Sequence, residues 1–368
     1  MSEVKTQADD ITMSGGGLYS LATIGAKDVI DIATPLVTNA IKETNLDDDV
    51  NAFLLSDMGC ADGGTSLDMV RNAIKTINAA HSSLPVQIVY ADQPRNDFNA
   101  LVKIVSGLSD FKTYLDEFDN VFPTFAGTSF YKQILPANTL HLGFSATAMH
   151  WLSAKPTNIS NHVHAVGAQG KELAAFQNHA RHDWETILRH RAKELHSGGH
   201  LVLVNFCRDQ QGRYLGNTDG KNMFDTFNQI WQQHVDDKVI TQDEYVNMTL
   251  PQYYNTVEEF SAPFNDPGSE VSKAGLRLQH IETRMVDCPF KVDFQRHGDA
   301  KKFARDYIPT IRTWNESIYF GALSARRPMQ ERNEIIENYY NTYESMVANN
   351  PEGHAMDYVH AYMVLKKD

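Results

Sequence analysis

A short apolar run that ends in an acid and opens into a glycine-rich loop is the most informative feature of this sequence. The segment reads FLLSDMGCADGG (53–64), and a helical pattern follows from residue 66. Strand, tight turn and helix in this order form the first unit of a nucleotide-binding sheet, and the glycines let a ligand lie against bare backbone. The loop has neither the Lys-Ser/Thr ending of a P-loop nor a strict G-x-G-x-x-G. Asp57, with Gly59 and Cys60, instead suits a ligand that carries a cationic centre and a ribose; another nucleotide fold and a structural turn are the alternatives.

A second acid ends the next apolar run. Asp92 lies in VYADQP (89–94), where a carboxylate can accept hydrogen bonds from both ribose hydroxyls. The alternative is an N-cap for a helix that begins near NDFN (96–99).

Two further pairs follow the next strands. Ser129 and Phe130, in GTSFY (127–131), can bond to and stack on an adenine, although spacing alone favours a helix cap with a buried Phe. His150 and Trp151 follow FSATAM (144–149) and offer two neutral N–H donors, which can hold a carboxylate without neutralising it fully. The alternative for this pair is a core Trp beside a surface His.

Other reactive residues are expected to be structural. His179, His182 and Asp183 resemble a metal spacing, but no second pair lies at a suitable distance, so we predict a solvated helix face and no metal. Cys60 is interpreted as a small apolar filler, and the sequence has no G-x-S-x-G nucleophile motif.

Composition narrows the class of protein. The chain has 368 residues, a net charge of −13 and three scattered cysteines, which argues against nucleic acid as a partner and against a disulfide framework. The first twenty residues contain no apolar segment typical of a signal peptide, and no stretch is long enough to span a membrane. We therefore expect a cytoplasmic globular protein with no membrane partner.

Apolar patterning predicts an α/β fold. We expect strands at 53–57, 86–91, 119–123, 139–145 and 200–206, separated by helices, and two late strands near 279–287 and 357–365. The helices are expected at 27–43, 65–80, 97–106, 130–134 and 171–196, the last stopped by the glycines of SGG (197–199). Alternation implies a mostly parallel Rossmann-like sheet. Residues 1–214 would bind the nucleotide, 215–347 form a mostly helical substrate cap with a sheet strand near 279–287, and 348–368 return a final strand to the sheet.

Taken together, the motifs resemble the SABATH family of S-adenosylmethionine-dependent carboxyl methyltransferases, whose members methylate small acids or, in some relatives, xanthine nitrogens. The resemblance covers nearly the whole chain and is carried by MSGG (13–16), DMGC (57–60), DQPRNDFN (92–99), GTSFY (127–131), HWLS (150–153) and PQY (251–253). It implies a class I methyltransferase fold, S-adenosylmethionine as the cofactor with S-adenosylhomocysteine as its product, a small carboxylic acid as the substrate, and a homodimer. The N-terminal segment would close the site.

The resemblance also assigns residues to two parts of a site. The cofactor side would comprise Tyr19, Thr23, Asp57, Gly59, Cys60, Asp92, Gln93, Ser129 and Phe130. The substrate side would comprise Ala26, Thr147, His150, Trp151, Phe224, Tyr307 and Tyr358, with His150 and Trp151 as the residues that hold the reacting carboxylate.

Departures from the family pattern bear on the substrate. Ala26 stands where the family usually has a carboxylate-binding Gln, and Thr147 and Ser14 also depart from the pattern. Arg305 or Arg312 on the cap could supply a replacement contact, which would suit a dicarboxylic acid; a surface Arg is the alternative. The expected reaction is methyl-ester formation on a small carboxylic acid, for which a dicarboxylic or aliphatic acid is one option and an aromatic or terpenoid acid stays open. N-methylation of a heterocycle, or non-catalytic binding of cofactor or acid, is the alternative.

Overall fold

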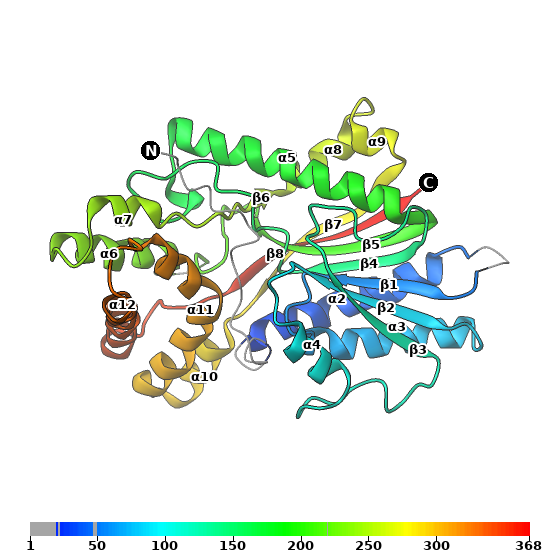
Figure 1. Ribbon diagram of the computed structural model, residues 1–368, viewed down its shortest axis with the longest axis horizontal. Coiled ribbons are helices and arrows are strands. Elements are labelled where there is room, and N and C mark those ends of the chain that lie inside the picture. The colour runs from blue at the N-terminus through cyan, green and yellow to red at the C-terminus, as the bar shows by residue number, and fades with distance from the viewer. Residues whose placement is uncertain (1–19, 21–22, 47–49, 219) are drawn as a thin grey trace.

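The core of the molecule is a twisted, mostly parallel sheet. The computed structural model describes residues 20, 23–46, 50–218 and 220–368. Strands lie in the order β3-β2-β1-β4-β5-β8-β7, of which β8 and β7 are antiparallel to their neighbours. This arrangement confirms the predicted Rossmann-like class (Figure 1). The strands are β1 (Phe53–Met58), β2 (Val86–Asp92), β3 (Val121–Gly127), β4 (Leu140–Ala146), β5 (Leu195–Arg208), β7 (Leu276–Val286) and β8 (Tyr358–Lys367), and β6 (Asn255–Thr256) pairs with the end of β5.

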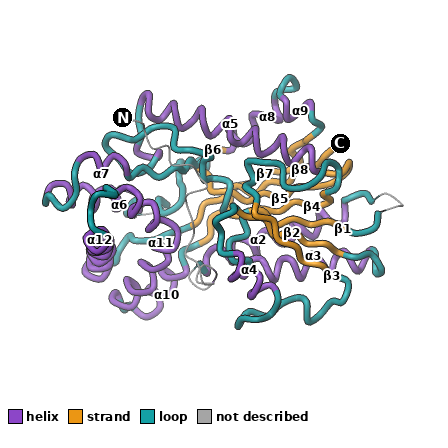
Figure 2. Tube along the Cα trace, viewed as in Figure 1, coloured by secondary structure: helices purple, strands orange, loops and turns teal. Residues whose placement is uncertain are grey.

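Helices cover both faces of the sheet (Figure 2). One layer contains α2 (Ile24–Glu43), α3 (Leu67–Ala80) and α4 (Phe98–Val105), and the other α5 (Gly170–Glu194), α8 (Val257–Asn265) and α9 (Glu270–Lys273). Short 3-10 turns, η2 (Gly64–Ser66) and η3 (Ala165–Gly167), precede α3 and α5. Every residue of β1 is buried, as expected for a central parallel strand covered on both sides.

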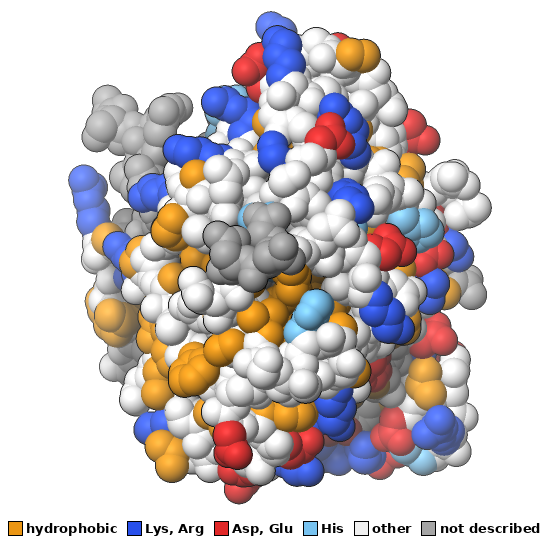
Figure 3. Space-filling model, turned by 90° about the vertical axis from the view of Figure 1, so that its right-hand side faces the viewer, with side chains coloured by type: hydrophobic (Ala, Val, Ile, Leu, Met, Phe, Trp, Pro, Cys, Tyr) orange, Lys and Arg blue, Asp and Glu red, His pale blue; other side chains and the backbone are white. Residues whose placement is uncertain are grey.

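A helical cap stands beyond the carboxyl ends of the parallel strands (Figure 1). It consists of α6 (Met223–Asp236), α7 (Gln242–Asn247), α10 (Pro289–His297), α11 (Ala300–Ala322) and α12 (Met329–Asn349). Buried Glu244 fastens α7 to the α11–α12 turn, because its two oxygens accept from Arg327 Nε and Nη2 at 2.6 and 2.7 Å. Figure 3 views the opposite end of the molecule, where acidic and basic side chains are interspersed rather than gathered by sign. Within the described residues, no helix is long and apolar enough to cross a membrane.

Several expected boundaries are wrong. Residues 130–134 form turns rather than a helix, because the segment is held by side chains of α5. Gly198 and Gly199 do not stop a helix: α5 ends at Glu194 and both glycines lie within β5. α8 and α9 pack with α5 on the sheet, although the sequence placed them in the cap.

A buried ion pair explains the shape of the 130–135 segment. Arg191 and Glu194 are fully buried on the last turn of α5, with Arg191 Nε 2.7 Å from Glu194 Oε2. The guanidinium donates to the carbonyls of Phe130 and Lys132 at 3.0 and 2.9 Å, and the carboxylate accepts from the Ile134 N–H at 2.5 Å. Backbone groups that could have formed a helix are therefore bound by side chains from a distant element.

We predict that Glu194→Gln lowers the free energy of unfolding by about 3–5 kcal/mol, because the Arg191 charge would remain buried without its partner. Urea unfolding followed by circular dichroism measures this. The matched control is Glu270→Gln, which breaks an exposed pair with Lys273 and should leave stability unchanged. Equal stability of the two variants would contradict the assignment.

Candidate active site

The candidate site lies where the strand order reverses, between β1 and β4. In open α/β sheets, ligands bind at the carboxyl ends of the strands at this point. Asp57 is the second-to-last residue of β1, Asp92 is the last residue of β2, and Thr147 directly follows β4. A first cavity here is lined by Ala26, Ile30, Asp57, Gly59, Cys60, Thr65, Ser66, Phe144, Ala146 and Thr147.

A close contact and several hydrogen bonds fix the conformation of the loop after β1. Gly59 has φ +77°, and a Cβ there would lie 2.4 Å from Ala148 Cβ, so a glycine is required. Asp92 accepts from the Ala61 N–H at 2.8 Å, and Asn96 Nδ2 donates to the Ala61 carbonyl at 2.8 Å. The N-cap of α4 is Asp97, so the capping alternative for Asp92 is wrong.

Asp57, which lines the cavity, and Asp92, which holds the loop beside it, both have raised pKa values. Burial, with a smaller contribution from Asp92, raises the pKa of Asp57 to about 7, while a 2.6 Å hydrogen bond from Ser66 Oγ acts in the opposite direction. Burial also raises the pKa of Asp92 to about 6, against two backbone hydrogen bonds. Burial first, and then the neighbouring carboxylates, raises the pKa of the Cys60 thiol, which fits a neutral filler rather than a nucleophile.

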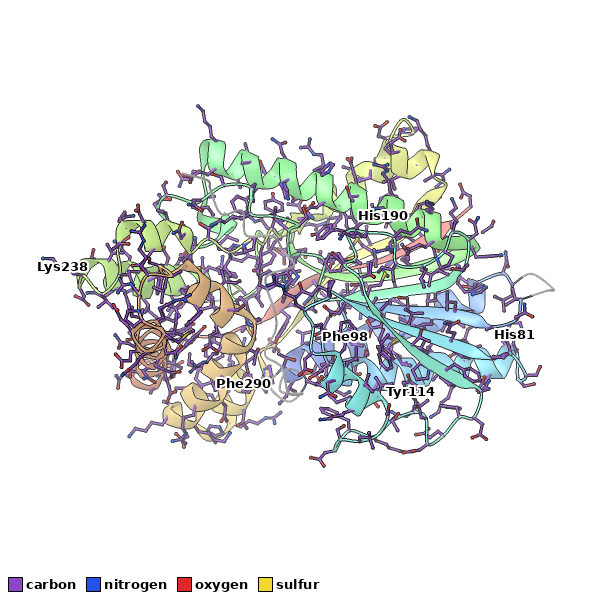
Figure 4. All side chains as sticks on the ribbon, in the orientation of Figure 1. His81, Phe98, Tyr114, His190, Lys238 and Phe290 are labelled. Atoms are coloured by element: carbon purple, nitrogen blue, oxygen red, sulfur yellow. The ribbon has the colours of Figure 1, made fainter. Side chains whose placement is uncertain are left out.

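The remaining residues expected on the cofactor side lie around this loop. Phe130 is half-buried, and its ring is 3.8 Å from the position a Cβ on Gly59 would take; no helix follows it, so the helix-cap alternative is wrong. Ser129 is beside it, and Gln93 follows β2. Phe98, at the start of α4, lies against Gly127 at the end of β3 (Figure 4). Tyr19 lies outside the described residues.

A second cavity adjoins the first and shares Ala26 and Thr147 with it. Its walls are Thr23, Ala26, Thr147, His150, Trp151, Phe206, Leu215, Gln252, Trp314, Met356 and Tyr358. None of these described lining residues is a Lys, Arg, Asp or Glu. Thr23, assigned to the cofactor side, lines this second cavity and is not among the walls of the first. Figure 4 shows side chains filling the region between the strand ends and the cap.

His150 and Trp151 do not have the environments of the alternative interpretation, a core Trp beside a surface His. His150 is buried and Trp151 is half-buried, so the pair is not a core Trp beside a surface His. Burial lowers the pKa of His150 to about 3, which keeps the imidazole neutral at physiological pH. Within the described residues its Nδ1 is buried and has no hydrogen-bond partner. A buried orphan atom of this kind suggests a ligand.

Two residues assigned to the pocket wall lie behind it. Phe224 is fully buried and stacks on His164, with ring centroids 4.1 Å apart. Tyr307 is fully buried in the cap, 3.4 Å from the hydroxyl of Tyr343. The sequence reasoning missed five lining residues, Phe206, Leu215, Gln252, Trp314 and Met356. Of these, Gln252 lay within a quoted motif, which was a usable signal.

The HWLS loop is fastened to α5 by a polar network. Asp183 is buried and accepts from the Ser153 N–H and Oγ, both at 2.7 Å. His179 Nε2 is 3.0 Å from Ser153 Oγ, and the Tyr131 hydroxyl donates to the Trp151 carbonyl. The expectation of a solvated face is therefore wrong for Asp183, although His182 is exposed.

The cap arginines do not reach this cavity. Arg312 binds Glu316 and Glu337 and lies over the Tyr340 ring, 5.1 Å from its centroid. Arg305 is exposed on α11. The surface alternative holds for both, and the structural argument for a second substrate carboxylate is lost.

Comparison with known proteins identifies the family. Residues 11–368 match the family model described as SAM dependent carboxyl methyltransferase. Salicylate carboxymethyltransferase of Clarkia breweri is 28% identical over 74% of this chain and 75% of its own length. Loganic acid O-methyltransferase of Catharanthus roseus is 24% identical over 70% and 73%. A solved structure of loganic acid methyltransferase with SAH covers 97% of this chain and 98% of its own, with a TM-score of 0.73 and 19% identity.

The chain belongs to the S-adenosylmethionine-dependent carboxyl methyltransferases of the SABATH family. It is a methyltransferase whose cofactor is S-adenosylmethionine.

The raised pKa values of Asp57 and Asp92 predict a pH-dependent cofactor affinity. Ribose hydroxyls and a cationic cofactor both need ionised carboxylates, so the dissociation constant for S-adenosylmethionine should rise about tenfold or more as pH falls from about 7.5 to 5.5. Isothermal titration calorimetry measures this, and Asp92→Asn should weaken binding and flatten the lower part of the profile. A flat profile in the wild type would contradict the prediction.

As pH falls, the ligand-free protein should become more stable, whereas its affinity for the cofactor should decrease. Both carboxyls have a higher pKa in the fold than the ordinary value of about 4, so their protonated forms favour the fold. This contribution is complete below pH about 4 and is lost as pH rises through about 6 to 7. Chemical unfolding of wild type and Asp57→Asn across this range measures it, and an equal pH dependence in both would argue against Asp57 as a source.

Asp183 is predicted to position Trp151. Asp183→Asn weakens two hydrogen bonds to Ser153, so kcat/KM for the methyl acceptor should fall about 10- to 100-fold through misplacement of the loop. Affinity for S-adenosylmethionine should be unchanged. The control is His182→Gln on the same helix, and equal kinetics for the two variants would remove Asp183 from this role.

Proposed function

We propose that this enzyme transfers the S-adenosylmethionine methyl group to a small carboxylic acid with one carboxylate and an apolar body, giving a methyl ester. The observation that carries the proposal is the second cavity, which combines neutral N–H donors with apolar walls and, among its described lining residues, no charged side chain. In this proposal the α/β part, 1–214, holds the cofactor, and the cap helices within 215–347, which exclude α8 and α9, cover the acid.

The two adjoining cavities support an in-line transfer. A sulfonium in the first cavity would lie near Asp57, and an acid in the second would meet it at Ala26 and Thr147, which line both. A carboxylate, with a pKa near ~4, is already ionised and needs no general base. Alignment in a dry cleft is what the protein must supply.

Neutral donors suit this chemistry. The pKa of His150 near 3 means that its imidazole does not become a cation beside the substrate. Positioning a carboxylate with neutral N–H groups leaves more of its charge on the attacking oxygen than a lysine would. Both charges diminish in the transition state, so the aromatic walls of Trp151, Phe206 and Trp314 favour it.

The lining of the second cavity also bears on the chemical class of the acid. Leu215, Met356 and Tyr358 extend the apolar lining toward the cap, which supports an aromatic or aliphatic body over a dicarboxylic acid. A homodimer and a cytoplasmic location remain predictions from the sequence; light scattering tests the first.

The direct test is transfer from labelled S-adenosylmethionine to a panel of benzoates, indole-acetate, fatty and terpenoid acids, fumarate-like diacids and xanthines. We expect base-labile labelled product from an apolar monocarboxylic acid, and about 10-fold or greater loss of kcat/KM in Trp151→Ala, through loss of a hydrogen bond to a charged group. Phe122→Ala, which alters an exposed ring on β3, is the control.

The other outcomes separate the alternatives. Base-stable label on a xanthine nitrogen alone would indicate an N-methyltransferase. A diacid as the preferred acceptor would contradict the monocarboxylate assignment, and cofactor binding without transfer to any acceptor would contradict the proposed function.

A further inference from the structure

Ala26 lies on helix α2 where the family resemblance leads us to expect a carboxylate-binding Gln, and a different amide, Gln252, lines the same cavity. We propose that the side-chain amide of Gln252 binds the substrate carboxylate together with His150 and Trp151. The inference rests on the proposed function, and it assigns the missing donor to the segment before β6 rather than to α2.

The environment of Gln252 fixes the direction of its amide. The side chain is 1% exposed, and its Oε1 accepts from the Tyr254 hydroxyl at 3.2 Å. With Oε1 bonded to the Tyr254 hydroxyl, Nε2 is the end of the amide that can face the cavity.

The three donors belong to one backbone unit. Trp151 and Gln252 form an antiparallel bridge. The Leu152 N–H donates to the Pro251 carbonyl at 2.8 Å, and the Tyr253 N–H donates to the His150 carbonyl at 3.1 Å. The spacing of Gln252 from His150 and Trp151 is therefore set by the main chain.

The chemistry of the site favours an amide at this position. A carboxylate has about four lone-pair sites, and one indole N–H and one imidazole cannot occupy all of them. A third neutral donor adds orientation without a compensating charge, whereas an arginine would partly neutralise the nucleophile. Gln252 also lies opposite no acidic group, since the described lining residues include no carboxylate.

The test uses full-length enzyme with the best acid from the panel. Gln252→Leu keeps the approximate size and removes the donor; Gln252→Glu also keeps an acceptor for Tyr254 but faces the substrate with a negative charge. We expect KM for the acid to rise about 10- to 100-fold in the first and further in the second, with the S-adenosylmethionine dissociation constant unchanged; Tm should fall in both, because the first leaves the Tyr254 hydroxyl without its acceptor and the second buries a charge. Gln229→Leu, an exposed amide on α6, is the matched control.

A complementary swap gives a second readout. Adding Ala26→Gln to Gln252→Leu restores an amide on α2, and it should recover a measurable part of the acid affinity, whereas a structural role for Gln252 would gain nothing. Unchanged acid affinity in both folded Gln252 variants, or a loss confined to Tm and cofactor binding, would overturn the inference while wild-type activity left the proposed function standing. A wild type that methylates no acid would contradict both.

Discussion

The contact between the loops after β1 and β4 is the constraint on which the site depends. Gly59 lies so close to Ala148 that a side chain cannot be placed there, and the neighbouring Thr147 takes φ +55°, which is rare for a β-branched residue. Thr147 is stabilised in this conformation by its N–H bond to the Val204 carbonyl at 2.8 Å and by His360, 3.1 Å from its hydroxyl. Thr147 lines both cavities, so the close approach of the two loops places the cavities side by side. An in-line transfer between them requires this.

Charge is divided between the two cavities in a way that matches the reactants. The acids Asp57 and Asp92 border the first cavity and its loop, and each is protonated more readily than an exposed Asp. The second cavity has neutral donors and no charged lining residue among those described. A cationic cofactor can therefore be paired on its own side while the anionic nucleophile is left partly unneutralised. Electrostatic preorganisation of this kind costs no rearrangement during the reaction.

The local sequence pattern predicted the positions of the strands and helices well. It predicted poorly the side-chain contacts between segments that are distant in sequence. Central strands such as β1 and β4 are almost fully buried and mostly apolar, so their positions and that of the loop at Asp57 followed directly from the sequence. The helix expected at 130–134 failed because Arg191 and Glu194, some sixty residues away in sequence, bind its backbone. Asp183 looked like a solvated helix residue for the same reason: its partner on the HWLS loop is thirty residues distant.

The substrate cavity shows why acid specificity was the least predictable feature. Its lining comes from α2, the loop after β4, the end of β5 and the loop that follows it, the segment before β6, α11 and the start of β8, so a single change in cap packing alters which side chains meet. Trp314 reaches it from α11, whereas Tyr307 on the same helix faces Tyr343 inside the cap. The resemblance assigned Tyr307 to the pocket wall and did not assign Trp314, because the packing of the helix decides which of its residues reaches the cavity. In the proposed arrangement, specificity can change through cap side chains that meet the body of the acid, such as Trp314, without disturbing His150 and Trp151 at the reacting carboxylate.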